Sequence, residues 1–341
     1  MTKMSPITKP ISTIPEALPI PGLRFRPYAG GADLPAMVDV ASAAGAANGD
    51  TEHDTVDSMR VEFSNMTHVD PSQDVILAFI HDRLIAFSSI EWADSTDGER
   101  HYRSLGDVHP DWRRRGIGTA MMARNERRLA EIASGHEFAG PRKLMTWLHD
   151  LDHGGIALSR QRGYEQVRVY HHMVRPDMDG IDAPPLAAGL EVRPVSRQQL
   201  PQLWEAIAVA FRDHFGSYDV SPAAYRRWSE DPLMDPGLLM VAFDGEEMTA
   251  GVQGAIDPEE NAAQGYLRGW TDPVFTRRSW RRRGLAYALL GRALQALKER
   301  GMTSAQLDVD SENANDALSL YRRHRFEVDR SSSEWHKSLT A

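Results

Sequence analysis

Trp280-Arg281-Arg282-Arg283-Gly284-Leu285-Ala286 has a near-copy upstream, Trp112-Arg113-Arg114-Arg115-Gly116-Ile117-Gly118. Each stretch follows a strand-like run and precedes a helical one. A strand, a glycine turn and a helix start form an anion site, because free backbone N–H groups and the positive end of the helix dipole converge there. Three arginines at a helix N-terminus are unfavourable without an anion, so the repeated pattern favours anion binding over a basic helix cap without a ligand. Neither stretch is a P-loop or a dinucleotide fingerprint, since no Gly-Lys-Ser/Thr follows and the third glycine is missing.

The two turns belong to an internal duplication that runs through the chain. Leu23-Arg24-Phe25-Arg26-Pro27 matches Leu190-Glu191-Val192-Arg193-Pro194, and Gly163-Tyr164 matches Arg325-Phe326, with other matches between them in the same order. The duplication predicts two like domains in tandem. We expect a flexible leader over residues 1–20, an N-terminal domain over 21–175, a proline-containing linker over 176–189 and a C-terminal domain over 190–341.

Each copy shows the same order of predicted elements. A first strand precedes a helix (34–43 and 200–211), then a hairpin (75–92 in the first copy, with the turn Asp244-Gly245 in the second). A strand then leads into the glycine turn (102–108 and 266–276), and Gly301 stands where the long helix of the second copy should end. Another strand (143–148 and 304–309), a short helix and a last strand close each copy. This order predicts a mixed α/β sheet, not a doubly wound parallel one.

Composition excludes several classes of protein. The 341 residues carry a net charge of −9 and contain no cysteine, which excludes disulfides and a thiolate nucleophile. The acidic balance argues against nucleic acid as a partner and against reading the arginine runs as nuclear-localisation signals. No stretch is apolar for long enough to suggest a membrane span or a signal peptide. We therefore expect a cytoplasmic monomer or homodimer that binds no membrane.

Both turns resemble the pyrophosphate-binding signature Arg-x-x-Gly-x-Gly/Ala of the GCN5-related N-acetyltransferases (GNAT), which bind acetyl-CoA. The resemblance covers both halves of the chain and implies two tandem GNAT domains. It implies that the strand before each turn bonds the pantetheine arm and that amides of the turn bind the pyrophosphate. The implied cofactor-binding residues of the C-terminal copy are Thr276, Arg281, Arg282, Arg283, Gly284, Leu285, Ala286, Tyr287 and Asn313. Those of the N-terminal copy are Val108, Arg113, Arg114, Arg115, Gly116, Ile117, Gly118 and Thr119.

A second resemblance lies in the segment from Asn313 to Tyr321. It is similar to the family's late helix, Asn-x-x-x-Ala-x-x-Leu-Tyr, followed by Gly-Phe. The resemblance implies that the Tyr321 hydroxyl protonates the leaving thiolate, which suits a phenol because it is neutral at pH 7 and can donate a proton. The alternative is that Tyr321 only packs its ring. Arg325 replaces the usual glycine, which predicts a strained turn. At the equivalent position of the first copy stands Ser159, a poor acid.

The general base is open at this point. Asp272, and either Asp308 or Asp310 at the end of the next strand, are candidates, although each could be a solvated strand-end residue. The cluster His149, Asp150 and His153 in the first copy could be a base or a weak metal site, but surface polar residues are the favoured interpretation and no metal is expected. We place the acceptor pocket in the segment that contains Phe211, His214, Phe215, Tyr218 and Tyr225.

Together these features predict an N-acetyltransferase. Acetyl-CoA would donate its acetyl group to a primary amine, favoured as that of a small molecule, by direct attack in a ternary complex. The C-terminal domain would catalyse, with Tyr321, Asp272 and Asp308 as candidate catalytic residues, while the N-terminal domain would bind acetyl-CoA or have lost that ability. Three alternatives remain: a non-catalytic acyl-CoA sensor, an acetyltransferase for protein amines, or two active domains in which Ser159 or a water relays the proton.

Overall fold

The computed structural model describes residues 14, 19–50, 55–66, 68–95, 98–212, 214–215, 220–313 and 315–339. Most of the predicted leader, and Tyr218 of the predicted acceptor pocket, lie outside these residues. By its internal contacts the chain divides into unit 1, Met1–Val167 with Ser333–Ala341, and unit 2, Arg168–Ser332. The predicted boundaries at 21–175, 176–189 and 190–341 stay a prediction.

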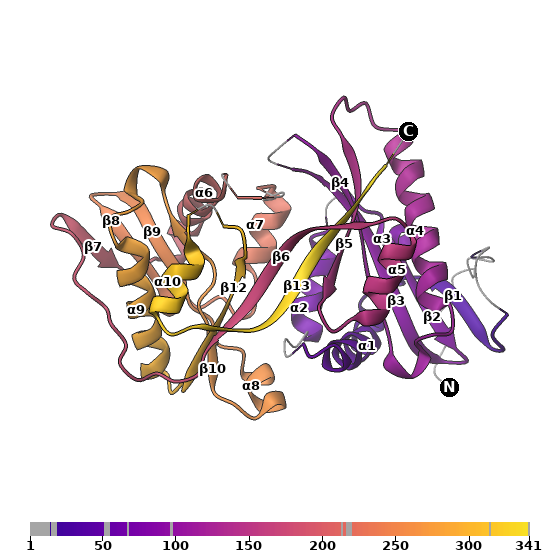
Figure 1. Cartoon of the computed structure of the whole chain (residues 1–341), viewed down its shortest axis with the longest axis horizontal. Helices are drawn as coiled ribbons and strands as arrows, with labels where there is room; N and C mark the ends of the chain where they lie inside the picture. Colours follow the sequence, from indigo (N-terminus) through magenta and orange to yellow (C-terminus); the bar gives the residue numbers. More distant parts are fainter. Residues whose placement is uncertain are drawn as a thin grey trace. The chain divides into compact units, whose positions relative to one another are not determined.

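Unit 1 is a mixed sheet in which antiparallel neighbours β1 to β4 precede a parallel pair, β4 and β5 (Figure 1). Beyond β5 comes the end of the last strand, β13. The strands are β1 Leu23–Pro27, β2 Val75–Ile80, β3 Arg83–Asp94, β4 Arg100–Val108, β5 Arg142–His149 and β13 Glu327–Ser338. The helices are α1 Leu34–Ala47, α2 Val56–Ser64, α3 Pro71–Asp74, α4 Ile117–Ser134 and α5 His153–Gln161.

Unit 2 repeats this plan with an antiparallel group, β7-β8-β9-β11, and a group β10-β12-β6 whose pair β10–β12 is parallel. Its strands are β6 Glu165–Arg175, β7 Leu190–Arg193, β8 Leu239–Asp244, β9 Glu247–Gln253, β10 Arg268–Trp270, β11 Val274–Thr276 and β12 Ser304–Asp310. Its helices are α6 Leu200–Phe211, α7 Pro222–Ser229, α8 Pro258–Gln264, α9 Leu285–Glu299 and α10 Ala317–Arg323. The mixed α/β fold is therefore confirmed.

The single strand expected over 266–276 is wrong, because the segment forms two strands with different partners. β10 pairs with β12, whereas β11 pairs with β9. Pro273 stands between them and has no N–H to donate, so a continuous ladder could not pass through it. The interruption leaves Asp272 outside both strands.

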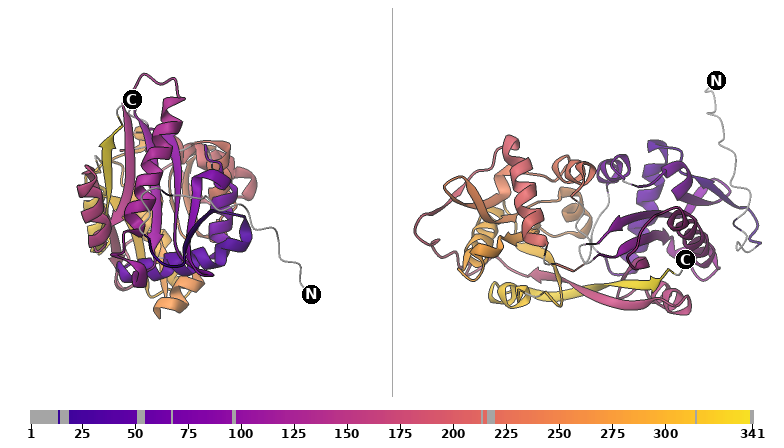
Figure 2. Two further views of the ribbon diagram at one scale, coloured as in Figure 1. Left: turned by 90° about the vertical axis from the view of Figure 1, so that its right-hand side faces the viewer. Right: turned by 90° about the horizontal axis from the view of Figure 1, so that it is seen from above.

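Each unit has three layers, with helices on both faces of the sheet. In β2 the alternate residues Ile76 and Ala78 join the core beneath α4, while Val75 and Leu77 join the core that includes α1. This period of two is that of a strand buried on both faces. The end-on view of unit 1 shows the magenta helix α4 lying over one face of the strands (Figure 2). In unit 2, α9 and α6 take the places of α4 and α1.

The last strands do not close the copies in the way the sequence suggests. From residue 168 onward β6 belongs to unit 2, where it pairs with β12, and from residue 333 onward β13 belongs to unit 1. Short-range patterns predict a strand but not its partner, which long-range packing decides.

The predicted linker is docked rather than free. Met178 is buried in the core of unit 2, Tyr287 of α9 donates to Asp182 at 3.0 Å, and Lys298 donates to the carbonyl of Met178 at 2.9 Å. A Cβ at Gly291 of α9 would lie 2.1 Å from the carbonyl oxygen of Asp182. The glycine therefore allows this close approach.

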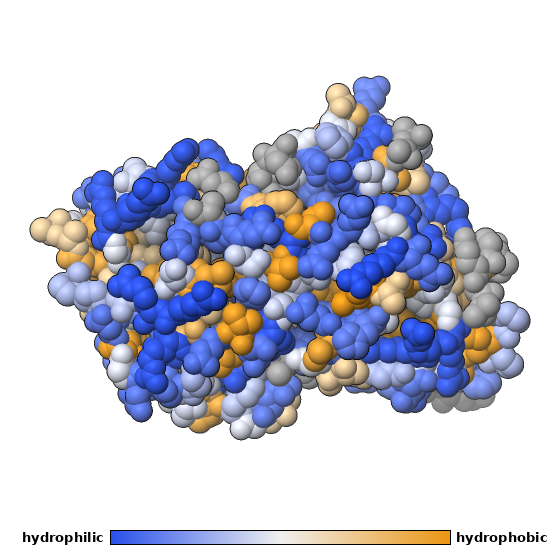
Figure 3. Space-filling view, viewed as in Figure 1, coloured by the Kyte–Doolittle hydropathy of each residue, from blue (hydrophilic) through white to orange (hydrophobic). Residues whose placement is uncertain are grey.

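No helix among the described residues is long and apolar enough to cross a membrane. The face drawn in Figure 3 is mostly hydrophilic, and its apolar residues form small separate groups. Apolar atoms in this arrangement are normal for a protein surface.

Candidate active site

The two glycine turns have the same backbone geometry. A 3-10 turn (Pro110–Trp112 or Arg278–Trp280) precedes each one, and a glycine with φ near 80° begins the helix: Gly116 at φ 80° and Gly284 at φ 76°. In both turns the middle arginine, Arg114 or Arg282, has a φ of 61°. A residue with a Cβ is strained in this left-handed region, so its presence in both copies indicates that the turn requires it.

Neither long helix has a side-chain cap. α4 and α9 begin at their glycines without a capping hydrogen bond from a side chain, whereas α2, α5 and α7 have one. Successive amides in such a turn point into one concavity, and the first amides of a helix have no partner within it. Both turns can therefore bind an anion through the backbone.

The three arginines of each triplet have different roles. The guanidinium of Arg113 donates to the carbonyls of Val108 (3.1 Å) and Ala44 (3.2 Å) and to the Asn48 side chain (2.9 Å). Arg281 makes the matching contacts, with the carbonyls of Thr276 (3.2 Å) and Ala210 (2.9 Å) and with Asn315 (3.2 Å). The first arginine thus holds the turn against α1 in unit 1 and against α6 in unit 2.

The other two arginines of each triplet are exposed. The third stacks on the tryptophan of its own turn, since Arg115 lies 4.4 Å from the ring centre of Trp112 and Arg283 lies 4.6 Å from that of Trp280. The second, Arg114 or Arg282, is therefore the arginine whose side chain is best placed to meet an anion.

Next to each turn, two parallel strands diverge. The β4–β5 ladder ends at Arg103 and Met145, although β4 continues to Val108. In unit 2 the β10–β12 ladder ends at Trp270 and Gln306, with one more bond from the Thr271 amide to the Gln306 carbonyl. Backbone groups beyond these points face an opening instead of a neighbouring strand, so an extended ligand can pair with them as an added strand would.

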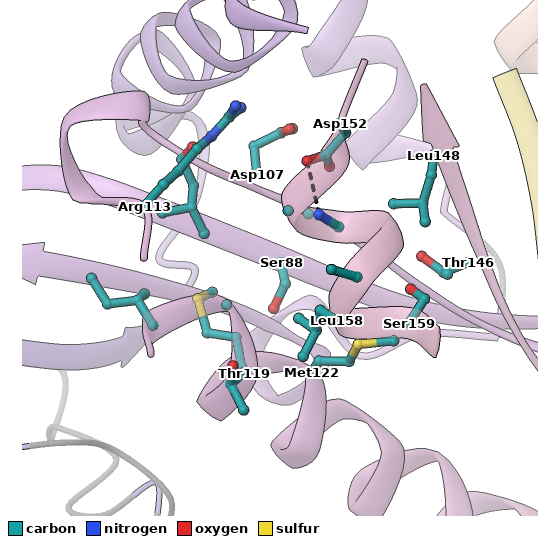
Figure 4. A pocket seen from close by; sticks show the side chains of 18 of the residues that line it. Ser88, Asp107, Arg113, Thr119, Met122, Thr146, Leu148, Asp152, Leu158 and Ser159 are labelled. Carbon is teal, nitrogen blue, oxygen red and sulfur yellow. Dashed lines mark hydrogen bonds between the residues drawn. The ribbon is translucent and has the colours of Figure 1, made fainter. Parts of the chain in front are cut away.

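In unit 1 the opening is part of a cavity of about 800 Å³. The end of β4, the turn and the first residues of α4 line it, together with β5 and α5. Figure 4 shows Thr146 and Ser159 at one end of this pocket and Arg113 at the other. The volume lies within the usual range for small-molecule and cofactor sites.

In unit 2 three side chains lie close enough to interact at the equivalent strand ends: Asp272 interacts with both Asp308 and Tyr321. Tyr321 is 5% exposed, and burial, then the nearby Asp272 carboxyl, raises its pKa above the ordinary value. Burial, then repulsion from Asp308, raises the pKa of Asp272 to about 7. A phenol that keeps its proton beside a carboxyl that titrates near neutral pH is a suitable acid and base pair.

Comparisons with known proteins place this geometry in a family. A family model described as the Acetyltransferase (GNAT) family matches residues 200–326. The mycothiol acetyltransferase of Kineococcus radiotolerans is 31% identical over 291 residues, which are 84% of this chain and 87% of that protein. This chain belongs to the GNAT family of acetyltransferases. Its sequence is also similar to the mycothiol acetyltransferase of Geodermatophilus obscurus. The two are 28% identical over 242 residues, which are 68% of this chain and 72% of that protein.

Solved GNAT structures show the same tandem fold. A GCN5-related N-acetyltransferase from Sphaerobacter thermophilus superposes with a TM-score of 0.68 at 23% identity, covering 94% of this chain and 96% of that one. A tandem GNAT protein from the clavulanic acid biosynthesis pathway gives 0.64 at 15% identity, covering 94% and 99%. Two tandem GNAT domains and the class of N-acetyltransferase are therefore confirmed, and GNAT acetyltransferases use an acyl-CoA donor.

The two GNAT copies differ at all three positions of the acid cluster. Phe326 donates its amide to the Tyr321 carbonyl at 3.0 Å, and Tyr164 donates to the Ser159 carbonyl at 3.0 Å, so Ser159 is the counterpart of Tyr321. The carbonyls of Val108 and Thr276 accept a hydrogen bond from the first arginine of their turns. Ser104 precedes Val108 in the chain by as many residues as Asp272 precedes Thr276, so Ser104 is the counterpart of Asp272. The parallel ladders begin at Arg142 in β5 and at Ser304 in β12. Thr146 and Asp308 follow these residues by the same number of positions, so Thr146 is the counterpart of Asp308.

These counterparts all carry a hydroxyl, and those of Thr146 and Ser104 make hydrogen bonds. Thr146 donates to the Ser104 carbonyl at 2.9 Å, and Asn125 donates to the Ser104 hydroxyl at 3.0 Å. Ser159 is buried. The GNAT copy in unit 1 thus keeps a turn and a cavity but has no carboxyl or phenol at these three positions.

Three other residues that the sequence placed in the GNAT sites, Asn313, Tyr287 and Asp310, make contacts within the protein. The Asn313 side chain accepts the amide of Asn315 at 2.9 Å, and Tyr287 stacks on His324 at 4.0 Å. Asp310 accepts two bonds from Arg168, both at 2.9 Å, and this ion pair argues against Asp310 as the base.

Arg325 has a φ of 63°, as the missing glycine predicted, and its guanidinium donates to Asp177 at 2.8 Å. The turn after α10 is nevertheless formed, and the arginine also holds the docked segment.

The predicted histidine cluster of the first copy is not a metal site among the described residues. His149 lies 3.3 Å from Asp50, and Asp152 caps α5 through the amide of Gly155 at 2.9 Å. In the acceptor segment, the rings of Phe211 and His214 contact each other in a tilted arrangement with centroids 4.2 Å apart, and Phe215 lies beneath Arg168 at 4.6 Å. The acceptor pocket itself stays a prediction.

His172 is a residue that sequence reasoning missed. It lies on β6, is buried, and its Nδ1 is 2.9 Å from the Asp308 carboxyl. Its Nε2 is buried and has no hydrogen-bond partner. No local signal could identify it, because β6 and β12 are far apart in sequence and meet only through strand pairing.

Proposed function

We propose that the chain transfers an acetyl group from acetyl-CoA to a primary amine of a small molecule, with catalysis in the C-terminal copy. The grouping of Asp272, Asp308 and Tyr321 beside the opening of unit 2 carries this proposal. Their replacement by Ser104, Thr146 and Ser159 in the first copy supports a binding role without catalysis for that copy.

In this mechanism the turn amides hold the pyrophosphate and the unpaired edge of β11 aligns the pantetheine arm. Asp272 accepts a proton from the acceptor ammonium, and the freed nitrogen lone pair forms a bond to the thioester carbon. The tetrahedral intermediate collapses as the C–S bond breaks, and the Tyr321 hydroxyl gives its proton to the sulfur. The nitrogen loses its second proton to solvent as the amide forms. The proton held by Asp272 passes through solvent to the Tyr321 oxygen, so both residues return to their starting states.

The named relatives suggest the first acceptor to test. Because they are mycothiol acetyltransferases, the amine from which mycothiol is made heads a panel that also contains simple amines, aminoglycosides and peptide amines. A protein amine acetyltransferase would prefer the peptides. An acyl-CoA sensor would turn over none of them.

The test measures thiol release from acetyl-CoA by the wild-type chain and by Tyr321→Phe, with acetyl-CoA binding followed calorimetrically. We expect Tyr321→Phe to lower kcat by about 10²–10⁴-fold and to leave binding unchanged, since only the proton donor is lost. Ser159→Ala is the matched control in the first copy and should turn over like the wild type. Equal turnover by wild type and Tyr321→Phe would overturn the assignment of the acid.

A further inference from the structure

Two Glu-x-His triplets lie in unit 1, away from the acyl-CoA cavity. Glu99-Arg100-His101 leads into β4, and Glu334-Trp335-His336 lies in the part of β13 that belongs to this unit. Residues two apart on a strand point to the same face, so each triplet presents a carboxyl and an imidazole together. The strand order β4-β5-β13 leaves one strand between them.

The four side chains form a compact, largely buried group. His101 Nε2 lies 3.2 Å from a Glu99 oxygen, and His336 Nε2 lies 2.5 Å from a Glu334 oxygen. The two imidazole rings are 4.7 Å apart and nearly perpendicular. His101 is 1% exposed, His336 8% and Glu334 3%, while about a quarter of the Glu99 side chain is exposed.

One atom in this group lacks a partner. His101 Nδ1 is buried and makes no hydrogen bond. A buried polar atom without a partner costs about 1–3 kcal/mol, and an unseen ion is one of the few explanations for it.

We propose that Glu99, His101 and His336 bind one divalent transition-metal ion of the zinc type. Imidazole nitrogen and carboxylate oxygen are both ligands that zinc binds in proteins. Glu334 holds the His336 ring in place, as carboxylates next to ligating histidines do. The positive charge of the ion would offset the negative charge of the Glu99 and Glu334 carboxylates. Lys143 Nζ, 3.9 Å from Glu99, adds a further positive charge on that side.

The distances suit this ion after a small closure of the site. Each of the three residues has a ligand atom within 4.8 Å of the others, so these atoms must move closer together before all three can reach zinc bond lengths of about 2.0–2.2 Å. The ion ties the last strand to β4, at the end of β4 opposite the residues that line the acyl-CoA cavity.

The test uses the full chain, freed of metal with a chelator and then titrated with ZnCl₂. We expect one zinc ion per chain by calorimetry and by elemental analysis after desalting. Thermal unfolding should shift upward by several degrees, since zinc binds the folded state. Cobalt(II) should give the intense visible absorption of a tetrahedral site.

Glu99→Gln is the decisive variant, because Glu99 is the most exposed ligand and its loss leaves the buried histidines in place. It should weaken zinc binding at least tenfold, whereas His101→Gln, if folded by circular dichroism, should abolish it. His149→Gln removes a carboxyl-paired histidine of the same unit that belongs to no group of three potential metal ligands among the described residues, and it should bind zinc like the wild type.

Two results would overturn the proposal. One is a wild-type chain that retains no zinc and shows no thermal shift, which would mean that the four side chains only pair with one another. The other is equal zinc affinity in wild type and Glu99→Gln, which would assign the binding to other histidines among the thirteen in the chain.

Discussion

Replacing Asp272 by asparagine tests the catalytic base through the pH dependence of the rate. Burial, then repulsion from Asp308, raises the pKa of Asp272 to about 7, so its basic form is populated only above that pH. We therefore expect kcat/KM of the wild type to rise with pH through about 7. The Asp272→Asn variant should lose about 10²–10⁴-fold in kcat/KM together with this limb of the profile.

The same shift in pKa predicts a change in stability. Between about pH 4 and pH 7 the unfolded chain releases the Asp272 proton while the folded chain keeps it, so stability falls as pH rises through this window and is level above it. Three pH units at 1.36 kcal/mol each set an upper bound of about 4 kcal/mol. Asparagine has no such dependence, so Asp272→Asn should be more stable than the wild type at pH 8 and equal to it near pH 4.

Urea unfolding at pH 4, 6 and 8 measures the difference in stability between the wild type and Asp272→Asn. Initial rates of thiol release at a series of pH values measure the rise of kcat/KM with pH. Asp308→Asn is the matched variant: it removes the repulsion and should move the limb to lower pH. A wild-type limb near the ordinary carboxyl pKa would refute the reasoning. So would an Asp272→Asn chain that is no more stable than the wild type at pH 8.

Three further substitutions test the surroundings of the site. Arg281→Ala should lower the free energy of unfolding by about 1–3 kcal/mol, because the Ala210 carbonyl loses a charged donor, and chemical denaturation measures this loss. His172→Phe should lower kcat about tenfold and shift the pH profile with little change in KM, since the Asp308 carboxyl loses its hydrogen bond; an unchanged profile would assign His172 a packing role only. Arg325→Gly should change thermal stability by less than about 1 kcal/mol, because relief of the positive φ offsets the lost ion pair.

Local patterns in the sequence were enough to predict the turns and the mixed fold. Gly116 and Gly284 form the turns that their place between a strand and a helix predicted, and both have positive φ. Gly301, with a φ of 88°, follows the last residues of α9 as a helix-ending glycine should. Each of these features depends on a few neighbouring residues and on backbone conformation, which sequence reasoning handles well.

Features that depend on distant residues could not be predicted. The Arg113 side chain is held by a hydrogen bond to Asn48, and the Asp308 carboxyl is held by a hydrogen bond to His172. In each pair the two residues are far apart in the sequence. The segment expected as a linker docks on α9 because Gly291 leaves room for its backbone. Such partners are chosen by tertiary packing, and no periodicity within one segment contains that information.

The central claim is that the C-terminal copy catalyses while the N-terminal copy only binds acyl-CoA. The most direct test compares Gly116→Glu with Gly284→Glu, each of which places a strained, negatively charged residue where a pyrophosphate would bind. No atom lies within 4 Å of a Cβ at Gly284, so charge and backbone strain, not collision, cause the effect.

Acetyl-CoA titration and thiol release should be measured on the same samples. The account predicts two binding sites in the wild type, one in each variant, and loss of turnover in Gly284→Glu alone. Turnover that survives in Gly284→Glu and disappears in Gly116→Glu would contradict it.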